Sequence, residues 1–204
     1  MPQYRLVITA LLCMNLSSFE IKISFEDPIR YESQLKFIED LKNIDSRSSI
    51  KKLISSQDWI ESHSLQFRPF TKKLNLHIHS KEPIFTLNKK YYVDSELNTF
   101  KYSGNDKSLI EVNGEIFQLE DVVVLIKYIK KLNTDNFNHI NSINYSHVSG
   151  WLIDLNKTQV RLGKNLNEEK LKLFKETLDY LNNNNKIPSM IDLRYKEGVA
   201  IKHG

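Results

Sequence analysis

Apolar and polar residues alternate strictly from Phe19 to Phe25, in the order Phe-Glu-Ile-Lys-Ile-Ser-Phe. Successive side chains of an extended chain point to opposite faces, so this segment has one apolar face and one polar face. The pattern predicts a strand that is buried on one side.

Two amphipathic helices are expected after Asp27-Pro28. The first has an apolar stripe at spacings of three and four residues, formed by Tyr31, Leu35, Ile38 and Leu41. The second is expected to begin near Ser48 or Ser49, because either hydroxyl group can accept a hydrogen bond from a free main-chain N–H group. The residues that this helix and the turn after it are expected to bury are Ile50, Leu53, Ile54 and Trp59.

A hairpin is expected next, because two alternating segments, 65–68 and 74–79, flank the turn residues Pro69-Phe70-Thr71. The first part of the chain therefore has the order strand, helix, helix, strand, strand, and it closes near Pro83. A small sheet with two helices on one face allows both kinds of element to bury their apolar sides.

The second half of the chain is rich in strand patterns, which we place at 91–94, 99–100, 143–148, 151–155 and 159–162. The last two flank Asn156-Lys157-Thr158, so they are expected to form a hairpin. A wide apolar face predicts a helix over 119–132. A further helix is expected after Asn167, a good N-cap followed by the acidic pair Glu168-Glu169.

The C-terminal segment follows a run of asparagines at 182–185, where the preceding helix is expected to end. It predicts a strand over 189–195, a turn in which Gly198 takes a positive φ, and a final strand up to Lys202. The expected fold class is α+β: a strand-helix-helix-strand-strand domain, and after it an antiparallel sheet with flanking helices.

Composition and charge limit the classes of function. Hydrophobic residues make up 40% and charged residues 26% of the chain, as in ordinary folded proteins. The net charge of +4 comes from scattered lysines, and nucleic-acid binding normally needs a clustered basic face. Cys13 is the one cysteine, so the chain has neither an internal disulfide nor a thiolate metal cage.

The N-terminus carries an apolar run, Leu6–Met14, directly after Arg5. A membrane-spanning helix needs about 20 apolar residues, whereas runs of about 10 to 14 are typical of signal-peptide cores or buried elements. The run therefore indicates an export or anchor segment, here bounded as residues 1–18. A buried first strand or helix of the folded domain is the alternative.

No motif for catalysis or nucleotide binding occurs in the sequence, so we expect neither an enzyme nor a cofactor. His77 and His79 lie two residues apart on the polar face of a predicted strand. They form a metal site only if a third ligand such as His63 lies close to them. A solvated strand face is the alternative, and we assign no metal ligand.

Four segments resemble, in this order, the FtsQ/DivIB family of bacterial cell-division proteins: Asp58–Leu65, Leu74–Ile84, Tyr92–Phe100 and Ile191–Ala200. The resemblance implies an inner-membrane anchor at 1–18, a POTRA domain at 19–86 and a β domain at 87–204. It also implies a single-pass protein whose folded part lies in the periplasm at the division septum.

The resemblance further implies a scaffold that binds the division proteins FtsB and FtsL, and a POTRA domain that helps to recruit later division proteins. FtsB is expected to add a strand to the C-terminal edge of the β domain. The residues that match this site are Arg194 and Tyr195 on the penultimate strand, and Gly198, Val199, Ala200, Ile201 and Lys202. Alternatively, Tyr195 is a core residue and Asp192 and Arg194 are ordinary solvent-facing residues.

Three features depart from the family's pattern. The turn after Val93-Asp94 has Leu97-Asn98 in place of glycine, and we expect Asn98 to supply the left-handed conformation. The apolar run at the N-terminus is short, and the C-terminus, Lys202-His203-Gly204, carries no aromatic residue. A different class of function is a POTRA-type helper of outer-membrane protein assembly, which also acts by strand addition.

Overall fold

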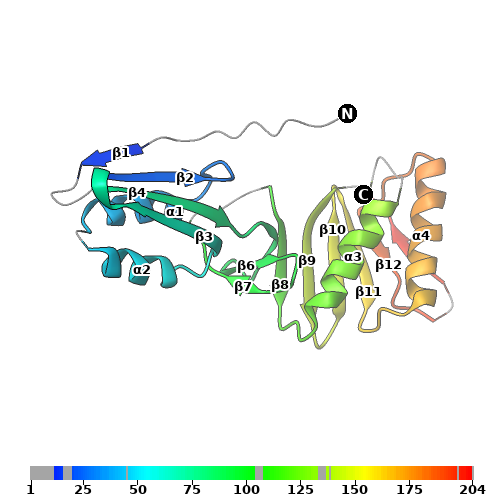
Figure 1. The fold of residues 1–204 in the computed structure, drawn as a ribbon. Coiled ribbons are helices and arrows are strands. Elements are labelled where there is room, and N and C mark those ends of the chain that lie inside the picture. Colours follow the sequence, from blue (N-terminus) through cyan, green and yellow to red (C-terminus); the bar gives the residue numbers. More distant parts are fainter. Residues whose placement is uncertain are drawn as a thin grey trace. The chain divides into compact units, whose positions relative to one another are not determined.

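The computed structural model describes residues 12–15, 20–44, 46–103, 108–132, 137, 139–196 and 198–203, with main chain alone at 12–15 and Pro69. The chain divides into two compact units, the first formed by residues up to Pro83 with 98–107, the second by 84–97 with 108–204 (Figure 1). Within the described ranges, no helix is long and apolar enough to span a membrane.

The first unit is a four-stranded sheet with two helices on one face. Its elements are β1 (Leu12–Asn15), β2 (Glu20–Phe25), α1 (Glu32–Lys42), α2 (Arg47–Ser55), β3 (Ile60–Arg68), the 3-10 turn η1 (Pro69–Thr71) and β4 (Lys73–Ser80). The strand order is β1-β2-β4-β3, in which β2 and β4 are parallel and the other neighbours antiparallel. The predicted strand-helix-helix-strand-strand order is confirmed, and β1 precedes it.

The buried face of this sheet is the one that sequence alternation predicted. Ile21, Ile23 and Phe25 of β2 are buried, as are Leu74, Leu76 and Ile78 of β4. The helices cover them with apolar residues of their own, which include Phe37, Ile38, Leu41, Ile50 and Ile54.

Helix α1 is rotated relative to the stripe that we expected. Leu35 is 57% exposed, whereas Gln34 and Phe37 are buried. Gln34 is the third residue of the helix, where its Oε1 accepts hydrogen bonds from the main-chain N–H groups of Arg30 (2.9 Å) and Tyr31 (3.0 Å). The buried amide is satisfied in this way and the helix turns its polar residue inward. The expected start of α2 was also wrong, because Ser46 caps it by accepting from the N–H of Ser49 (3.1 Å).

An aromatic cluster closes the core of the first unit around Trp59. The ring of Tyr102 lies 3.8 Å from that of Tyr31 and 5.7 Å from that of Trp59, and Phe37 meets Trp59 edge-on at 5.6 Å. The segment around Tyr102 therefore packs in the first unit, whereas our expected second domain, 87–204, included it. The division after Pro83 lies close to the expected one after residue 86.

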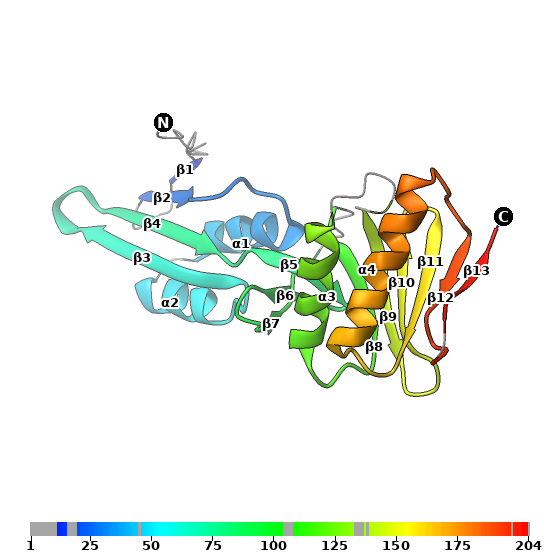
Figure 2. The same cartoon turned by 90° about the vertical axis from the view of Figure 1, so that its right-hand side faces the viewer.

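The second unit is built on a large mixed sheet. Its strands and helices are β5 (Pro83–Leu87), β6 (Tyr91–Asp94), β8 (Ile110–Gly114), α3 (Leu119–Lys131), β9 (Ile140–Ser146), β10 (Gly150–Leu155), β11 (Thr158–Gly163), α4 (Glu168–Asn183), β12 (Met190–Asp192) and β13 (Ala200–Lys202). The strand order is β13-β12-β11-β10-β9-β8-β5-β6, and β7 (Thr99–Phe100) follows β6. Figure 2 shows α3 and α4 beside each other on one face of the sheet.

The sequence predicted an antiparallel sheet, but the sheet of the second unit is mixed. The pairs β9-β10, β10-β11 and β12-β13 are antiparallel, but β8-β9 and β11-β12 are parallel. Each of these parallel pairs is joined through a helix, α3 or α4, which returns the chain to the same end of the sheet. Buried residues of both helices, such as Leu125 and Phe174, share one core with the sheet.

The turn after β6 differs from the prediction in which residue takes the left-handed conformation. Leu97, and not Asn98, has the positive φ, at 66°. The main-chain oxygen of Asp94 accepts from the N–H of Leu97 (3.1 Å), and its carboxylate accepts from the N–H of Glu96 (3.0 Å). These hydrogen bonds hold a leucine in a conformation that normally favours glycine or asparagine.

Candidate functional site

Strand β13 lies at the end of the large sheet and is paired on one side only. Its register with β12 places Ile201 opposite Ile191 and Ala200 opposite Asp192. Figure 2 shows β13 as the outermost strand, next to β12. No strand in the described part of the chain pairs with its outer side. The predicted C-terminal edge strand is therefore present.

The main-chain groups on the outer side of β13 follow from its hydrogen bonds. The carbonyl oxygen of Lys202 faces β12, since it accepts from the main-chain N–H of Ser189 at 2.9 Å. Successive residues of a strand direct their N–H and C=O groups to opposite sides, so those of Ile201 face outward. An added strand would therefore meet the N–H and C=O groups of Ile201.

Arg194 and Tyr195 do not lie on the penultimate strand, which was predicted over 189–195. Strand β12 ends at Asp192, because the carboxylate of Asp192 accepts from the N–H of Arg194 (3.1 Å) and turns the chain. Leu193 is fully buried, but Tyr195 is 57% exposed. The alternative that Tyr195 belongs to the core is therefore wrong.

The carboxylate of Asp192 forms an ion pair with Arg194. The guanidinium donates from Nη2 to Oδ2 (2.6 Å) and from Nε to Oδ1 (2.9 Å). These hydrogen bonds hold the pKa of the Asp192 carboxyl below its ordinary value, although burial acts in the opposite direction. Asp192 is buried, so it is not the solvent-facing residue of our alternative interpretation. A partner carboxylate would have to compete with Asp192 for Arg194.

An open depression lies beside the edge strand. Its lining residues are Tyr195, Lys196, Gly198, Val199 and Ala200. Gly198 has the predicted positive φ, at 131°, and a side chain at this position would meet no atom within 4 Å. The fold thus brings Tyr195 next to the start of β13. Sequence reasoning did not name Lys196, although its place between Tyr195 and Gly198 was a usable signal.

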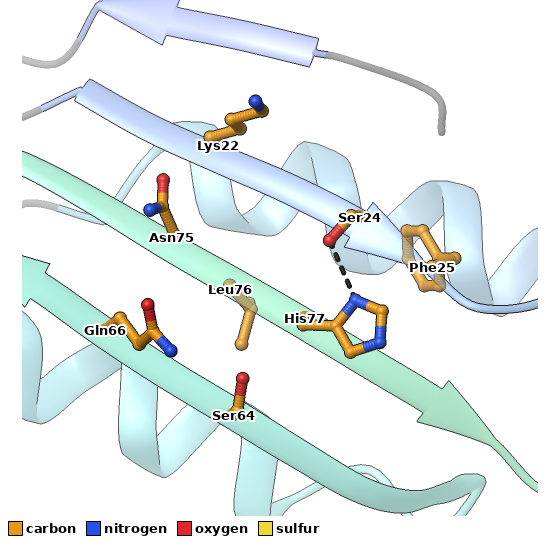
Figure 3. A pocket seen from close by; sticks show the side chains of 8 residues that line it. All are labelled: Lys22, Ser24, Phe25, Ser64, Gln66, Asn75, Leu76 and His77. Carbon is orange, nitrogen blue, oxygen red and sulfur yellow. Dashed lines mark hydrogen bonds between the residues drawn. The ribbon is translucent and has the colours of Figure 1, made fainter. Parts of the chain in front are cut away.

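The other surface with candidate chemistry is the open face of the first sheet. Figure 3 shows the polar side chains that line a hollow there: Lys22, Ser24, Ser64, Gln66, Asn75 and His77. His77 is hydrogen-bonded to the hydroxyl of Ser24 at 2.9 Å. This face carries the predicted pair of histidines.

The geometry does not bring His63 to the histidine pair. His63 lies directly opposite Ile78 on the neighbouring strand, so it belongs to the other face of the sheet. His79 instead lies between two carboxylates, 3.8 Å from Glu26 and 3.5 Å from Glu61. Among the residues that the structure describes, no three His, Cys, Asp or Glu side chains are placed to hold a metal ion.

The second unit is an α+β domain, in which a mixed sheet has two crossover helices and ends in a strand that is paired on one side among the described residues. A family model described as "Cell division protein FtsQ/DivIB, C-terminal" matches residues 85–194. The chain therefore belongs to the FtsQ/DivIB family of cell-division proteins. A comparison with curated proteins gave no match. The matched region ends before Tyr195 and β13.

Proposed function

We propose that the chain is a non-enzymatic scaffold of the bacterial division machinery, which binds FtsB and FtsL. Membership of the family implies a role in cell division. The observation that supports strand addition is the outer side of β13, with which no described strand pairs and toward which the main-chain groups of Ile201 are directed. In this proposal a segment of FtsB pairs with β13.

Exposed side chains next to β13 support partner binding at the same edge of the sheet. Tyr195 offers an aromatic ring with a hydroxyl group, a combination that is common at the centre of protein interfaces. Lys196 and Lys202 add positive charge to this edge, whereas Asp192 already balances the charge of Arg194. We therefore propose that the FtsB segment is extended and carries acidic side chains beside its strand.

We further propose that residues 1–18 anchor the protein in the inner membrane, with both folded units in the periplasm at the septum. The support is the apolar run Leu6–Met14 with Arg5 before it. Residues 1–11 and 16–18 lie outside the described residues, and Leu12–Asn15 form β1. The first unit, as a POTRA domain, would recruit later division proteins.

The alternative function, a helper of outer-membrane protein assembly, depends on the same kind of strand edge. The match to the division family over 85–194 favours the scaffold instead. The two functions differ in partner: an FtsB segment for the scaffold, and unfolded outer-membrane strands for the helper.

Replacing Tyr195 with alanine is expected to weaken binding of the periplasmic segment of FtsB by about tenfold, the effect of losing a moderately important interface residue. Tyr195 lies outside the core, so the variant should remain folded. A pull-down of FtsB by the full-length chain in detergent, followed by titration, measures the change.

Tyr180→Ala is the matched control, because Tyr180 is 55% exposed, close to the 57% of Tyr195. Tyr180 belongs to helix α4 and not to the segment that leads into β13. FtsB binding by this variant should equal that of the wild type. Equal affinities for both alanine variants would contradict the proposed site, and no binding by the folded wild-type chain would contradict the proposed function.

A further inference from the structure

Two loops of the second unit place large apolar side chains in solvent. Strands β8 and β9 are parallel, so the loop after β8 and the turn after β9 leave the sheet at the same end. Phe117 in the first of these loops is 84% exposed, and Val148 in the second is 90% exposed. Apolar residues that gather in solvent mark an interaction surface, whereas single ones need no explanation.

The two loops are held against each other through His147. Its ring lies 5.6 Å from the ring of Phe117, and its Nε2 lies 3.4 Å from a carboxylate oxygen of Glu115 in the loop after β8. The turn of His147 is itself fixed, because the hydroxyl of Ser146 accepts from the main-chain N–H of Ser149 at 3.1 Å. Apolar side chains on loops that are already ordered lose little conformational entropy when a partner covers them.

A hollow lies directly beside Phe117. Its volume is about 170 Å³, and the apolar part of its lining comes from Ile116, Phe117, Tyr145 and Trp151. The rings of Tyr145 and Trp151 are 4.8 Å apart. An apolar cavity of about 150 Å³ is large enough to hold benzene. The hollow is therefore of the size of one phenyl ring, and an exposed phenyl ring stands next to it.

The rim of the hollow carries one charge of each sign. Asp121 and Lys164 both line it. In the part of the chain that the structure describes, neither of them forms an ion pair. A two-fold axis brings the same patch of two subunits face to face, so a patch with an exposed ring, a hollow for a ring and both charges is complementary to itself.

We propose that the hollow receives Phe117 of a second copy of this chain. The two copies are related by a two-fold axis, and each inserts its Phe117 ring beside Trp151 of the other. Asp121 of each copy then faces Lys164 of the other. This dimer surface lies on the loops after β8 and β9, and it is separate from the edge of β13 that the proposed function assigns to FtsB.

Sedimentation equilibrium of the full-length chain, in density-matched detergent with a reducing agent, tests the dimer. The mean protein mass should rise with concentration from 24.0 kDa towards twice this value. A wild-type chain that stays monomeric up to about 1 mM, where even weak complexes are populated, would overturn the proposal. A mass that rises beyond the dimer would overturn the two-fold geometry, because a closed pair leaves no patch free.

Phe117→Ser tests the inserted ring. Both copies lose the ring in this variant, so the dissociation constant of the dimer should rise about a hundredfold, or about tenfold for each ring. Phe70→Ser is the matched control, because Phe70 is also fully exposed but belongs to η1 of the first unit. It should dimerise as the wild type does. Equal dissociation constants for the two serine variants would overturn the proposal.

A charge exchange tests the contact between Asp121 and Lys164 without changing Phe117. Lys164→Glu makes both rim charges negative, and Asp121→Lys makes both positive, so each variant alone should dimerise about tenfold more weakly than the wild type. An equimolar mixture should regain dimers, because each negative rim then meets a positive one. A mixture that associates no more tightly than either variant alone would overturn the two-fold contact. FtsB takes no part in these experiments, so their outcome is independent of the proposed function.

Discussion

Replacing Gly150 with alanine is expected to destabilise the second unit by at least about 3 kcal/mol, among the largest effects of any single substitution. Gly150 has a φ of 76°, and a Cβ atom there would lie less than 3.0 Å from main-chain atoms of Gly163 and Lys164. β10 and β11 are both interior strands, so they cannot separate without loss of sheet hydrogen bonds. Urea unfolding followed by circular dichroism measures the change.

Gly163→Ala is the control for the backbone conformation. Gly163 has a similar φ of 85°, but a Cβ atom there meets only the side chain of Arg194, at 3.5 Å. The expected loss is therefore about 1 to 2 kcal/mol, the strain of a left-handed residue alone. If Gly150→Ala destabilises the protein no more than Gly163→Ala, the close approach of β10 and β11 is not what requires a glycine.

Trp59→Ala is expected to unfold the first unit and to leave the second unit folded. Trp59 is 1% exposed, contacts the rings of Phe37 and Tyr102, and donates from Nε1 to the side chain of Gln57 (2.9 Å). Loss of a buried tryptophan costs about 3 to 5 kcal/mol, which approaches the total stability of a small unit.

Hydrogen exchange separates the two units in this experiment. Peptides from β2 and β4 should lose their protection in Trp59→Ala, whereas peptides from β10 and β11 should keep it. Trp151 provides a fluorescence reporter for the second unit, because it is buried there. Trp59→Phe keeps an aromatic ring and should retain protection in both units. Loss of protection throughout Trp59→Ala would show that the two units do not unfold separately.

The elements with strong local signals were predicted correctly from the sequence. The alternation in β2 identified Ile21 and Ile23 as core residues, because a period of two leaves one arrangement that buries all apolar side chains. Asn167 was predicted as the N-cap of α4, and its side chain accepts from the N–H of Lys170 at 2.9 Å. In both cases the determining contacts lie within a few residues or within one strand.

Two of the errors, the burial of Gln34 and the direction of β12, arose where residues distant in sequence decide the structure. Gln34 of helix α1 is buried because its amide donates a hydrogen bond to the hydroxyl of Ser80 on strand β4, at 3.1 Å. No local pattern reveals that partner. The parallel pairing of β11 with β12 depends on the path of α4 over the sheet. The error at Leu97 has a local cause, because hydrogen bonds to Asp94, three residues earlier, fix the turn against the preference of leucine.

The candidate site was predicted in part. The terminal strand and the turn at Gly198 follow from local composition, and both are present. The ion pair of Asp192 with Arg194 was not foreseen, although the two residues are close in sequence. The prediction placed Asp192 and Arg194 on one continuous strand. The strand instead ends at Asp192, whose carboxylate accepts from the N–H of Arg194 and turns the chain before Tyr195.

The affinity of the full-length chain for the periplasmic segment of FtsB, measured for the wild type, Ile201→Pro and Ile201→Ala, tests strand addition at β13 most directly. Proline removes the outward N–H of Ile201 and is tolerated on an edge strand, whereas alanine keeps this donor. Binding should weaken at least tenfold in Ile201→Pro, about 1.4 kcal/mol, and by less than half of that free energy in Ile201→Ala. Wild-type affinity in a folded Ile201→Pro variant would contradict the docking of FtsB on this edge.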